Sequence, residues 1–216
     1  MKFLALFDSN LVDSATGDTG VLSDAAALST RDSENANAVL ANEVLCTNDD
    51  GYITYPANNG RQFMGDWVFV LKFVIDSFDY SNTWTNYYNG IYQERNADGS
   101  RSNQRFGVEV TDTKFKFELN GVKYSDAAVP LSTGTWYQAV LRYDAANLRM
   151  EYSMGSSELT NTMHTQQYTS DLTSFLDEPA IVLGRRNNAD HGGRFHGCVE
   201  SAAKEKIENA GEHCEH

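Results

Sequence analysis

The chain has 216 residues with 41% hydrophobic and 12% aromatic content and only three prolines, which predicts one folded domain over residues 1–216 rather than a disordered or linker-rich chain. Its formal net charge is −13, so its electrostatic field opposes close approach to nucleic-acid phosphates and to anionic lipid. We expect neither as a partner, and we expect no membrane insertion, because no apolar run approaches the ~18 residues that an inserted helix needs.

The amino-terminal segment has the pattern of a first β-strand. Residues 1–7 imitate the start of a secretory signal peptide, but Asp8 ends the apolar region after five residues, short of the roughly 7–15 that such a region needs. Residues 13–48 follow, rich in Ala, Ser, Asp and Asn and with weak periodicity. We predict a long surface segment there, with one helical turn around residues 35–42.

A long buried strand is predicted at residues 67–75. Phe69, Leu71, Phe73 and Ile75 alternate onto one face, while Lys72 lies among valines on the other. This period of two is typical of a strand that is covered on at least one side.

Residues 76–104 form the longest polar insertion and are dense in aromatic side chains. Aromatic rings stack on the C–H faces of sugars, while amide, carboxylate and guanidinium groups bind the hydroxyls, so the insertion suits a saccharide site. Packing of the loop onto the domain and contact with a neighbouring subunit are the alternatives, because Tyr and Trp are also enriched at protein interfaces. The candidate ligand-binding residues are Trp84, Tyr87, Tyr88, Tyr92, Asn86, Asn89 and Arg95.

Two hairpins are predicted in the second half of the chain. Lys114–Leu119 alternates cleanly, and Asn120-Gly121 is the two-residue turn signal that leads into Val122–Ser125. Gly134–Asp144 and Asn147–Tyr152 alternate in the same way around a tight turn. These patterns predict an antiparallel meander, in which we expect Trp136 to fill the core.

Five short motifs follow one another along the chain. They are an Asp-Ser-x-x-Gly loop at 13–17, an Asp-Gly-Tyr-Ile-x-x-Pro strand at 50–56, a Gly-x-Trp-Tyr hairpin at 134–137, a Leu-Gly-Arg strand at 183–185 and a Phe-x-Gly-Cys strand at 195–198. Their order and spacing resemble laminin-G-like domains, members of the concanavalin-A-like jelly-roll class. The resemblance implies an all-β fold, an antiparallel two-sheet β-sandwich, and recognition rather than catalysis.

The three cysteines leave two interpretations open. The resemblance implies a disulfide between Cys198 and Cys214, which leaves Cys46 without a partner. Three reduced thiols are the alternative, because no secretion signal is visible.

Calcium is the one cofactor that the resemblance suggests, because related domains hold it at the rim with Asp and Asn oxygens. The candidate ligands are Asp190 with Asn187 and Asn188, and a second candidate pairs Asp98 with Asn96. Thr133 stands where calcium-binding relatives often carry Asp, so that part of the resemblance fails. A solvated acidic surface is the alternative explanation of the carboxylates.

No catalytic motif is found. Retaining glycosidases need two carboxyls roughly 5–5.5 Å apart, and the closest strand, Glu109-Val110-Thr111-Asp112, has the wrong spacing. The pair His213 and His216 beside Cys214 matches no standard zinc pattern and indicates a polar tail. We therefore expect no catalytic residue and no enzyme.

The leading functional hypothesis is a subunit on the surface of a virus or bacteriophage particle, as a decoration, knob or fibre, that binds a glycan or another surface protein and forms a homo-oligomer. It rests on the resemblance and on an acidic chain without a visible signal or anchor. The alternatives are a cellular or secreted lectin module and a glycan-active hydrolase or lyase.

Overall fold

The computed structural model describes residues 3–7, 10–23, 26–30, 43–47, 51–61, 65–78, 89–98, 106–111, 114–119, 122–126, 130–147, 149–156, 162–167, 179–184 and 195–207. In these ranges the regular structure is β-strand apart from one 3-10 turn, η1 (Asn59–Arg61). No helix within them is long and apolar enough to cross a membrane.

The strands are short at the amino-terminal end and long in the centre. In chain order they are β1 (Phe3–Leu6), β2 (Val21–Leu22), β3 (Ala26–Thr30), β4 (Glu43–Thr47), β5 (Ile53–Tyr55), β6 (Trp67–Ser77), β7 (Asn89–Arg95), β8 (Phe106–Val110), β9 (Phe115–Leu119), β10 (Val122–Asp126), β11 (Trp136–Asp144), β12 (Arg149–Gly155), β13 (Thr162–Gln167), β14 (Ala180–Leu183) and β15 (His196–Lys206).

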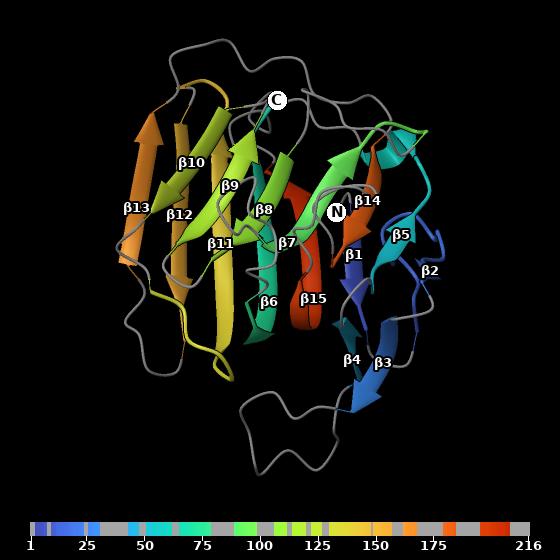
Figure 1. Ribbon diagram of the computed structural model, residues 1–216. Helices are drawn as coiled ribbons and strands as arrows, with labels where there is room; N and C mark the ends of the chain where they lie inside the picture. The colour runs from blue at the N-terminus through green and yellow to red at the C-terminus, as the bar shows by residue number, and fades with distance from the viewer. Residues whose placement is uncertain are drawn as a thin grey trace, which may run out of the picture.

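The described strands form two antiparallel sheets that lie face to face (Figure 1). The first sheet has the order β13-β12-β11-β6-β15-β4-β3, and β1 also pairs with β15. The second sheet has the order β10-β9-β8-β7-β14-β5-β2. The fold is therefore an antiparallel two-sheet β-sandwich, as the sequence predicts.

The core lies between the sheets and is rich in aromatic rings. Phe69 of β6 contacts Tyr92 of β7 and Phe106 of β8, with ring centroids 4.7 and 5.0 Å apart. Trp67, two residues earlier on the same face of β6, contacts Phe106 at 5.0 Å. This packing confirms the inward face predicted for residues 67–75, whose side chains alternate between buried and half-buried along most of the strand.

Both predicted hairpins are present. β9 and β10 pair from Leu119 and Val122 outward, and β11 and β12 pair from Asp144 and Arg149 outward. The strands agree with the sequence pattern because each hairpin keeps a strict period of two.

The prediction of a surface segment at residues 13–48 is wrong in part. This range contributes β2, β3 and β4, and β4 pairs with the central strand β15. The helical turn predicted around residues 35–42 lies outside the described residues.

Trp136 is buried, as predicted, but on the face of β11 that points away from the main core. Tyr137 belongs to the main core, so Trp136 points to the opposite face of β11. There it is 6% exposed and packs in a second, smaller cluster with Val44, Val74 and Cys198. Lys72 covers this indole, with its Nζ atom 5.8 Å from the ring centroid.

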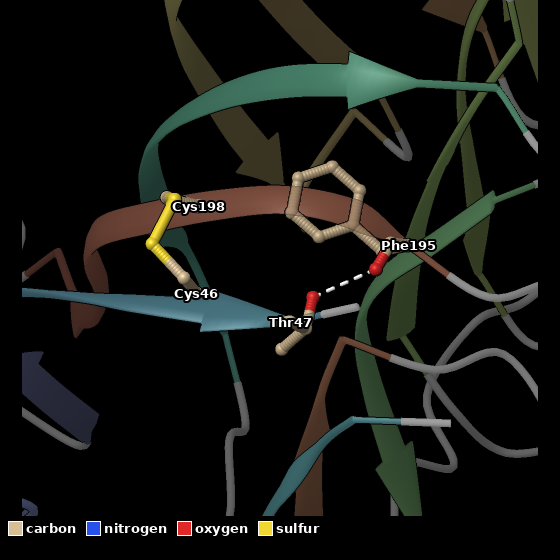
Figure 2. The surroundings of a disulfide bond; sticks show 4 residues. All are labelled: Cys46, Thr47, Phe195 and Cys198. Atoms are coloured by element: carbon tan, nitrogen blue, oxygen red, sulfur yellow. Dashed lines mark hydrogen bonds between the residues drawn. A yellow bond between two sulfur atoms is a disulfide. The ribbon is translucent and has the colours of Figure 1, made fainter. Parts of the chain in front are cut away.

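A disulfide joins Cys46 of β4 to Cys198 of β15 (Figure 2). This corrects both cysteine hypotheses, because Cys46 rather than Cys214 is the partner of Cys198 and the two thiols are not reduced. Beside the bond, the hydroxyl of Thr47 donates a hydrogen bond of 2.7 Å to the carbonyl oxygen of Phe195. The bond closes a loop with a sequence separation of 152 residues and ties β4 to the centre of the first sheet.

The glycine of the Phe-x-Gly-Cys motif has a steric role. A Cβ atom on Gly197 would lie 2.1 Å from the carbonyl oxygen of Val74 and 2.9 Å from the ring of Phe195. Any larger residue would therefore push β15 away from β6 at a point where the register already shifts.

Candidate functional site

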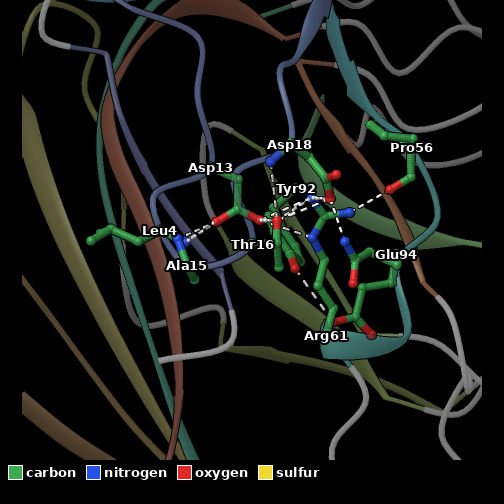
Figure 3. Close-up of polar contacts among 10 residues, drawn as sticks. Leu4, Asp13, Ala15, Thr16, Asp18, Pro56, Arg61, Tyr92 and Glu94 are labelled. Atoms are coloured by element: carbon green, nitrogen blue, oxygen red, sulfur yellow. Dashed lines mark hydrogen bonds and ion pairs between the residues drawn. The ribbon is translucent and has the colours of Figure 1, made fainter.

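A buried polar cluster fixes the opening Asp-Ser-x-x-Gly loop against the turn after β5 (Figure 3). Asp13 is fully buried, and its Oδ1 accepts hydrogen bonds from the backbone N–H groups of Leu4 and Ala15, at 2.9 and 3.0 Å. Its Oδ2 accepts from Nε and Nη2 of Arg61, at 3.0 and 2.9 Å. Two guanidinium donors thus converge on one carboxylate oxygen, and charge-assisted hydrogen bonds of this kind are among the stronger ones in proteins.

Asp18 completes the cluster from the same loop. Its Oδ2 accepts hydrogen bonds from Nη2 of Arg61 at 2.9 Å, from Nδ2 of Asn58 at 2.7 Å and from the hydroxyl of Thr16 at 2.9 Å. Both oxygens of Asp13 and Oδ2 of Asp18 are thus already engaged with hydrogen-bond donors. We assign the cluster a structural role, in which Asp13 of the loop motif and Asp18, the residue after the motif, both bind Arg61.

A second buried ion pair lies inside the sandwich. The ammonium of Lys204 on β15 contacts Oε1 of Glu94 on β7 and also lies over the rings of Trp67 and Phe106, at 4.8 and 5.3 Å from their centroids. Glu94 also accepts hydrogen bonds from the Tyr92 hydroxyl at 3.3 Å and from the backbone N–H of Phe106 at 3.1 Å. The pair therefore connects the two sheets through the core.

Burial shifts the pKa of three groups in this interior. Desolvation lowers the pKa of Lys204, although Glu94 partly offsets the change. Desolvation raises the pKa of the Tyr92 hydroxyl, and the negative charge of Glu94 adds to the increase. The pKa of Tyr55 is raised mainly by desolvation and further by Asp13.

The face of the second sheet that points away from the core is polar. On β9, Phe115, Phe117 and Leu119 belong to the core, so Lys116 and Glu118 point the opposite way. The pairing of β8 with β9 places Glu109 opposite Lys116 and Gly107 opposite Glu118. The Nζ atom of Lys116 lies 3.2 Å from Oε2 of Glu109.

Gln93 extends this polar face onto β7. It pairs with Gly107, so Gln93, Gly107 and Glu118 form one row across three strands. A Cβ atom on Gly107 would lie 2.6 Å from Nε2 of Gln93, which shows that the amide lies flat over β8. That Nε2 atom has no hydrogen-bond partner among the described residues, although the side chain is only 2% exposed.

We call Gln93, Glu109, Lys116 and Glu118 the polar face. Their exposed fractions are 2%, 1%, 2% and 0%. Buried polar side chains in folded proteins are nearly always hydrogen-bonded, and an exception indicates a functional role or an absent partner. The polar face offers one amide, two carboxylates and one ammonium on a rigid sheet, a set that can both donate to and accept from the hydroxyls of a ligand.

The structure places only part of the ligand-binding set predicted from residues 76–104. Tyr92 is a wrong assignment, because its ring is fully buried between the sheets and cannot stack on a sugar. Asn89 is buried and donates a 3.3 Å hydrogen bond to the carbonyl of Val110, and Arg95 is buried at the end of β7. Trp84, Asn86, Tyr87 and Tyr88 lie outside the described residues.

The structure does not test the predicted calcium ligands. Asp190, Asn187 and Asn188 lie outside the described residues, and Asn96 and Asp98 follow the end of β7. Within the described ranges, no three His, Cys, Asp or Glu side chains gather into a group that could hold a metal ion.

Comparison with solved structures identifies the architecture. The LG1-3 region of the laminin alpha2 chain has a TM-score of 0.53 and 13% identity, covering 72% of this chain and 29% of that one. A seed lectin of Lotus tetragonolobus has a TM-score of 0.52 and 9% identity, covering 95% of this chain and 100% of the lectin. The fold is that of the laminin-G-like and concanavalin-A-like jelly rolls, as the motifs predict.

The NanB sialidase of Streptococcus pneumoniae also matches, with a TM-score of 0.48 and 14% identity over 72% of this chain. This chain spans only 26% of that enzyme chain. No family model and no curated protein matches the sequence. At these identities the comparisons establish the fold alone.

Proposed function

We propose that this protein is a carbohydrate-recognition module whose polar face binds sugar hydroxyls. The observation that carries the proposal is the amide of Gln93, which is buried on the outward side of the second sheet and has no hydrogen-bond partner among the described residues. Specific saccharide sites combine a rigid scaffold with a few polar groups that fix orientation. The likeness of the fold to a seed lectin supports this choice of ligand.

The burial of the polar face sets a condition on binding. Because all four side chains are nearly inaccessible to solvent, a saccharide binds them only by replacing the contacts that now shield them. The proposal therefore requires a binding assay on the folded protein, paired with a measurement of stability.

We propose that recognition is non-catalytic. Glu109 and Glu118 lie on neighbouring strands, and paired carboxylates are the catalytic groups of most glycosidases, so hydrolysis is the second candidate. The ion pair between Glu109 and Lys116 argues against it, because it engages one of the two carboxylates. The hydrolase hypothesis would be favoured if the protein cleaved a polysaccharide and if Glu109→Gln or Glu118→Gln abolished that cleavage without unfolding the protein.

We also propose that the protein acts in an oxidising setting. The disulfide between Cys46 and Cys198 supports this, since such bonds persist in secreted proteins and on virion or cell surfaces and are rare in the cytosol. A particle surface is our first choice of setting and a secreted lectin is the second. Labelling of intact particles by an antibody against this chain, compared with the particle-free medium, distinguishes the two.

The test of the function is a glycan array probed with and without calcium. The wild-type protein is expected to retain a defined set of glycans, and Gln93→Ala is expected to reduce that binding at least tenfold. Gln138→Ala, at an exposed glutamine of β11 on the first sheet, is the matched control and is expected to bind normally.

Melting temperatures of the same variants separate binding from folding. Gln93→Ala should change stability by less than about 1 kcal/mol, because within the described part of the chain its Nε2 makes no hydrogen bond that the change removes. A marked fall in stability with normal binding by the remaining folded protein would assign the polar face to packing and refute the proposed site.

A further inference from the structure

We propose that the disulfide between Cys46 and Cys198 is a site of thiol–disulfide exchange in the folded protein. An external dithiol attacks Cys46, and reduction releases the β3–β4 pair from the first sheet while the rest of the sandwich stays folded. Neither step depends on glycan binding. Two features of the structure support them: the unequal burial of the two cysteines and the short ladder that joins β4 to β15.

Cys46 is the accessible half of the disulfide. Leu45 belongs to the main core, so Cys46 points to the outward face of the first sheet, where it is partly exposed (Figure 2). Cys198 is 0% exposed and packs in the second cluster with Trp136. A thiolate must reach the sulfur that it attacks, so access directs an external thiol to Cys46.

The exchange takes place in two steps. A thiolate of the dithiol forms a bond to Sγ of Cys46, the bond between the two protein sulfurs breaks, and Cys198 leaves with the electron pair. The second thiol of the reagent then attacks the reagent sulfur of this mixed disulfide and expels Cys46 as a thiolate. The two protons of the dithiol pass through solvent to the two protein thiolates. The dithiol is oxidised to a disulfide by loss of two electrons, and the protein disulfide is reduced to two thiols.

The ladder between β4 and the centre of the first sheet is short. β4 pairs with β15 only from Leu45 to Thr47, whereas β15 pairs with β6 along its whole length. β3 is the last strand in this sheet and pairs with β4 (Figure 1). Thr47 adds its hydrogen bond to the carbonyl of Phe195, and its methyl group lies beside Gly184. Movement of β3 and β4 together therefore breaks few pairings and leaves the central strands in place.

Cleavage of the disulfide favours this movement. Val44 and Leu45 are fully buried, and the covalent bond holds them there while it is intact. The sulfur that leaves Cys198 carries a charge inside an apolar cluster, which is unfavourable until water reaches it. Water enters when β4 moves away from β15, so the exchange and the release of the β3–β4 pair assist each other.

Trapping of the mixed disulfide tests the point of entry. The full chain receives a short pulse of reduced glutathione and is then alkylated and mapped by mass spectrometry. Glutathione on Cys46 with the alkyl group on Cys198 should exceed the reverse arrangement by about tenfold or more, because Cys198 is buried. The same pulse on Cys214→Ala removes the third cysteine of the chain as a source of exchange. Equal labelling, or glutathione mainly on Cys198, would overturn entry at Cys46.

The effect of urea on the rate of reduction tests whether the protein reacts in its folded state. Reduction by dithiothreitol should change by less than about threefold over urea concentrations below the unfolding transition. Exchange that requires global unfolding would instead accelerate with the full urea dependence of the unfolding free energy, about 1–3 kcal/mol per M. That steep dependence would refute exchange in the folded protein.

Hydrogen exchange of the oxidised and reduced proteins tests the release of the β3–β4 pair. Reduction should accelerate exchange of the β3 and β4 amides by about tenfold or more and leave β6, β11 and β12 within about twofold. Thr47→Val removes the hydrogen bond to Phe195 and should accelerate β4 further in the reduced protein. Thr54→Val makes the same change on β5 of the second sheet and should not affect β4.

Three results would contradict the release. Unchanged exchange in β4 after reduction would show that the disulfide is not what holds the pair in place. An equal acceleration in every strand would show a general loosening of the sandwich. Equal effects of Thr47→Val and Thr54→Val would refute the role of the contacts that join β4 to β15.

Discussion

The ion pair between Lys204 and Glu94 predicts that Lys204→Met destabilises the fold severely. Methionine has a similar volume, so the change removes charge more than packing. The carboxylate of Glu94 would keep its hydrogen bonds from Tyr92 and from the N–H of Phe106, but it would lose its counter-charge at 3% exposure. Loss of one partner from a buried pair costs about 3–5 kcal/mol, a large share of the roughly 5–15 kcal/mol of a typical domain.

A double-mutant cycle isolates the charge from the shape. Glu94→Gln keeps an acceptor for the N–H of Phe106 but removes the charge, so the double variant Glu94→Gln/Lys204→Met buries no uncompensated ion. We expect the double variant to be more stable than Lys204→Met alone, with a coupling free energy of about 2 kcal/mol or more. Urea denaturation at pH 7, followed by Trp fluorescence and circular dichroism, measures all four proteins.

Lys72→Met is the control for this cycle. Lys72 pairs with Glu200 at 2.7 Å, but both side chains are more than one fifth exposed, and such pairs contribute about 0–1 kcal/mol. We expect a loss of about 1 kcal/mol, including its contact with Trp136. A cost for Lys204→Met no greater than that of Lys72→Met, or strictly additive effects in the cycle, would refute the argument.

The pH dependence gives an independent check on Lys204. Because its pKa is lowered on folding, the unfolded chain binds more protons than the folded protein between the lowered value and the unfolded value of about 10.4. Stability therefore rises with pH through this window. Lys204→Met should remove this contribution, which a comparison of unfolding curves from pH 7 to 10 detects.

Four further predictions follow from other features. Replacement of Cys46 and Cys198 by alanine should lower the unfolding free energy by about 3–5 kcal/mol, because the disulfide closes a separation of 152 residues in the unfolded chain. Equal urea midpoints of the wild-type protein with and without reductant would contradict the presence of the disulfide. Trp136→Ala should cost about 3 kcal/mol as a large-to-small change at a site 6% exposed, and an unchanged melting temperature would show that the second cluster contributes little. Above about pH 10, the unfolding free energy should fall by about 1.4 kcal/mol per pH unit for each of Tyr55 and Tyr92, because both pKa values are raised on folding and the unfolded chain deprotonates first. Tyr55→Phe should halve this dependence of stability on pH, which thermal melts at pH 9–11 measure. Trp84→Ala and Tyr88→Ala, from the sequence-based site, should weaken glycan or subunit binding by about 2 kcal/mol with little loss of stability; lower melting temperatures with normal binding by the folded fraction would assign both residues to packing.

The sequence predicts those parts of the fold in which a strand shows one apolar and one polar face. The hairpins β9–β10 and β11–β12 and the inward face of β6 have this property, and all three are confirmed. β7 lacks this alternation of apolar and polar faces, because its inward positions include Glu94. The charge of Glu94 is compensated by Lys204, which lies more than one hundred positions later in the chain. The core role of Tyr92 was missed for the same reason.

The disulfide and the polar face depend on pairings between strands, which no local pattern contains. Cys46 lies opposite Cys198 only because β4 pairs with β15, and β4 lies in a segment of weak periodicity. The alternation of Lys116 and Glu118 is visible in the sequence, and the turn after Leu119 sets their register to β10. Their burial, and the approach of Gln93 over Gly107, emerge only once β7, β8 and β9 are aligned.

The position of β15 has a consequence for synthesis of the chain. β15 fills the middle of the first sheet, between β6 on one side and β4 and β1 on the other. Roughly 120 residues separate the end of β6 from the start of β15, so the ribosome needs roughly 6–25 s to supply the missing strand at about 5–20 residues per second. During that interval β6 has no partner on one edge, β4 is paired only with β3, and β1 lacks its partner β15. Cotranslational oxidation of Cys46 cannot reach its native partner either, which makes this period the one in which a nascent chain is most exposed to wrong pairing and to aggregation.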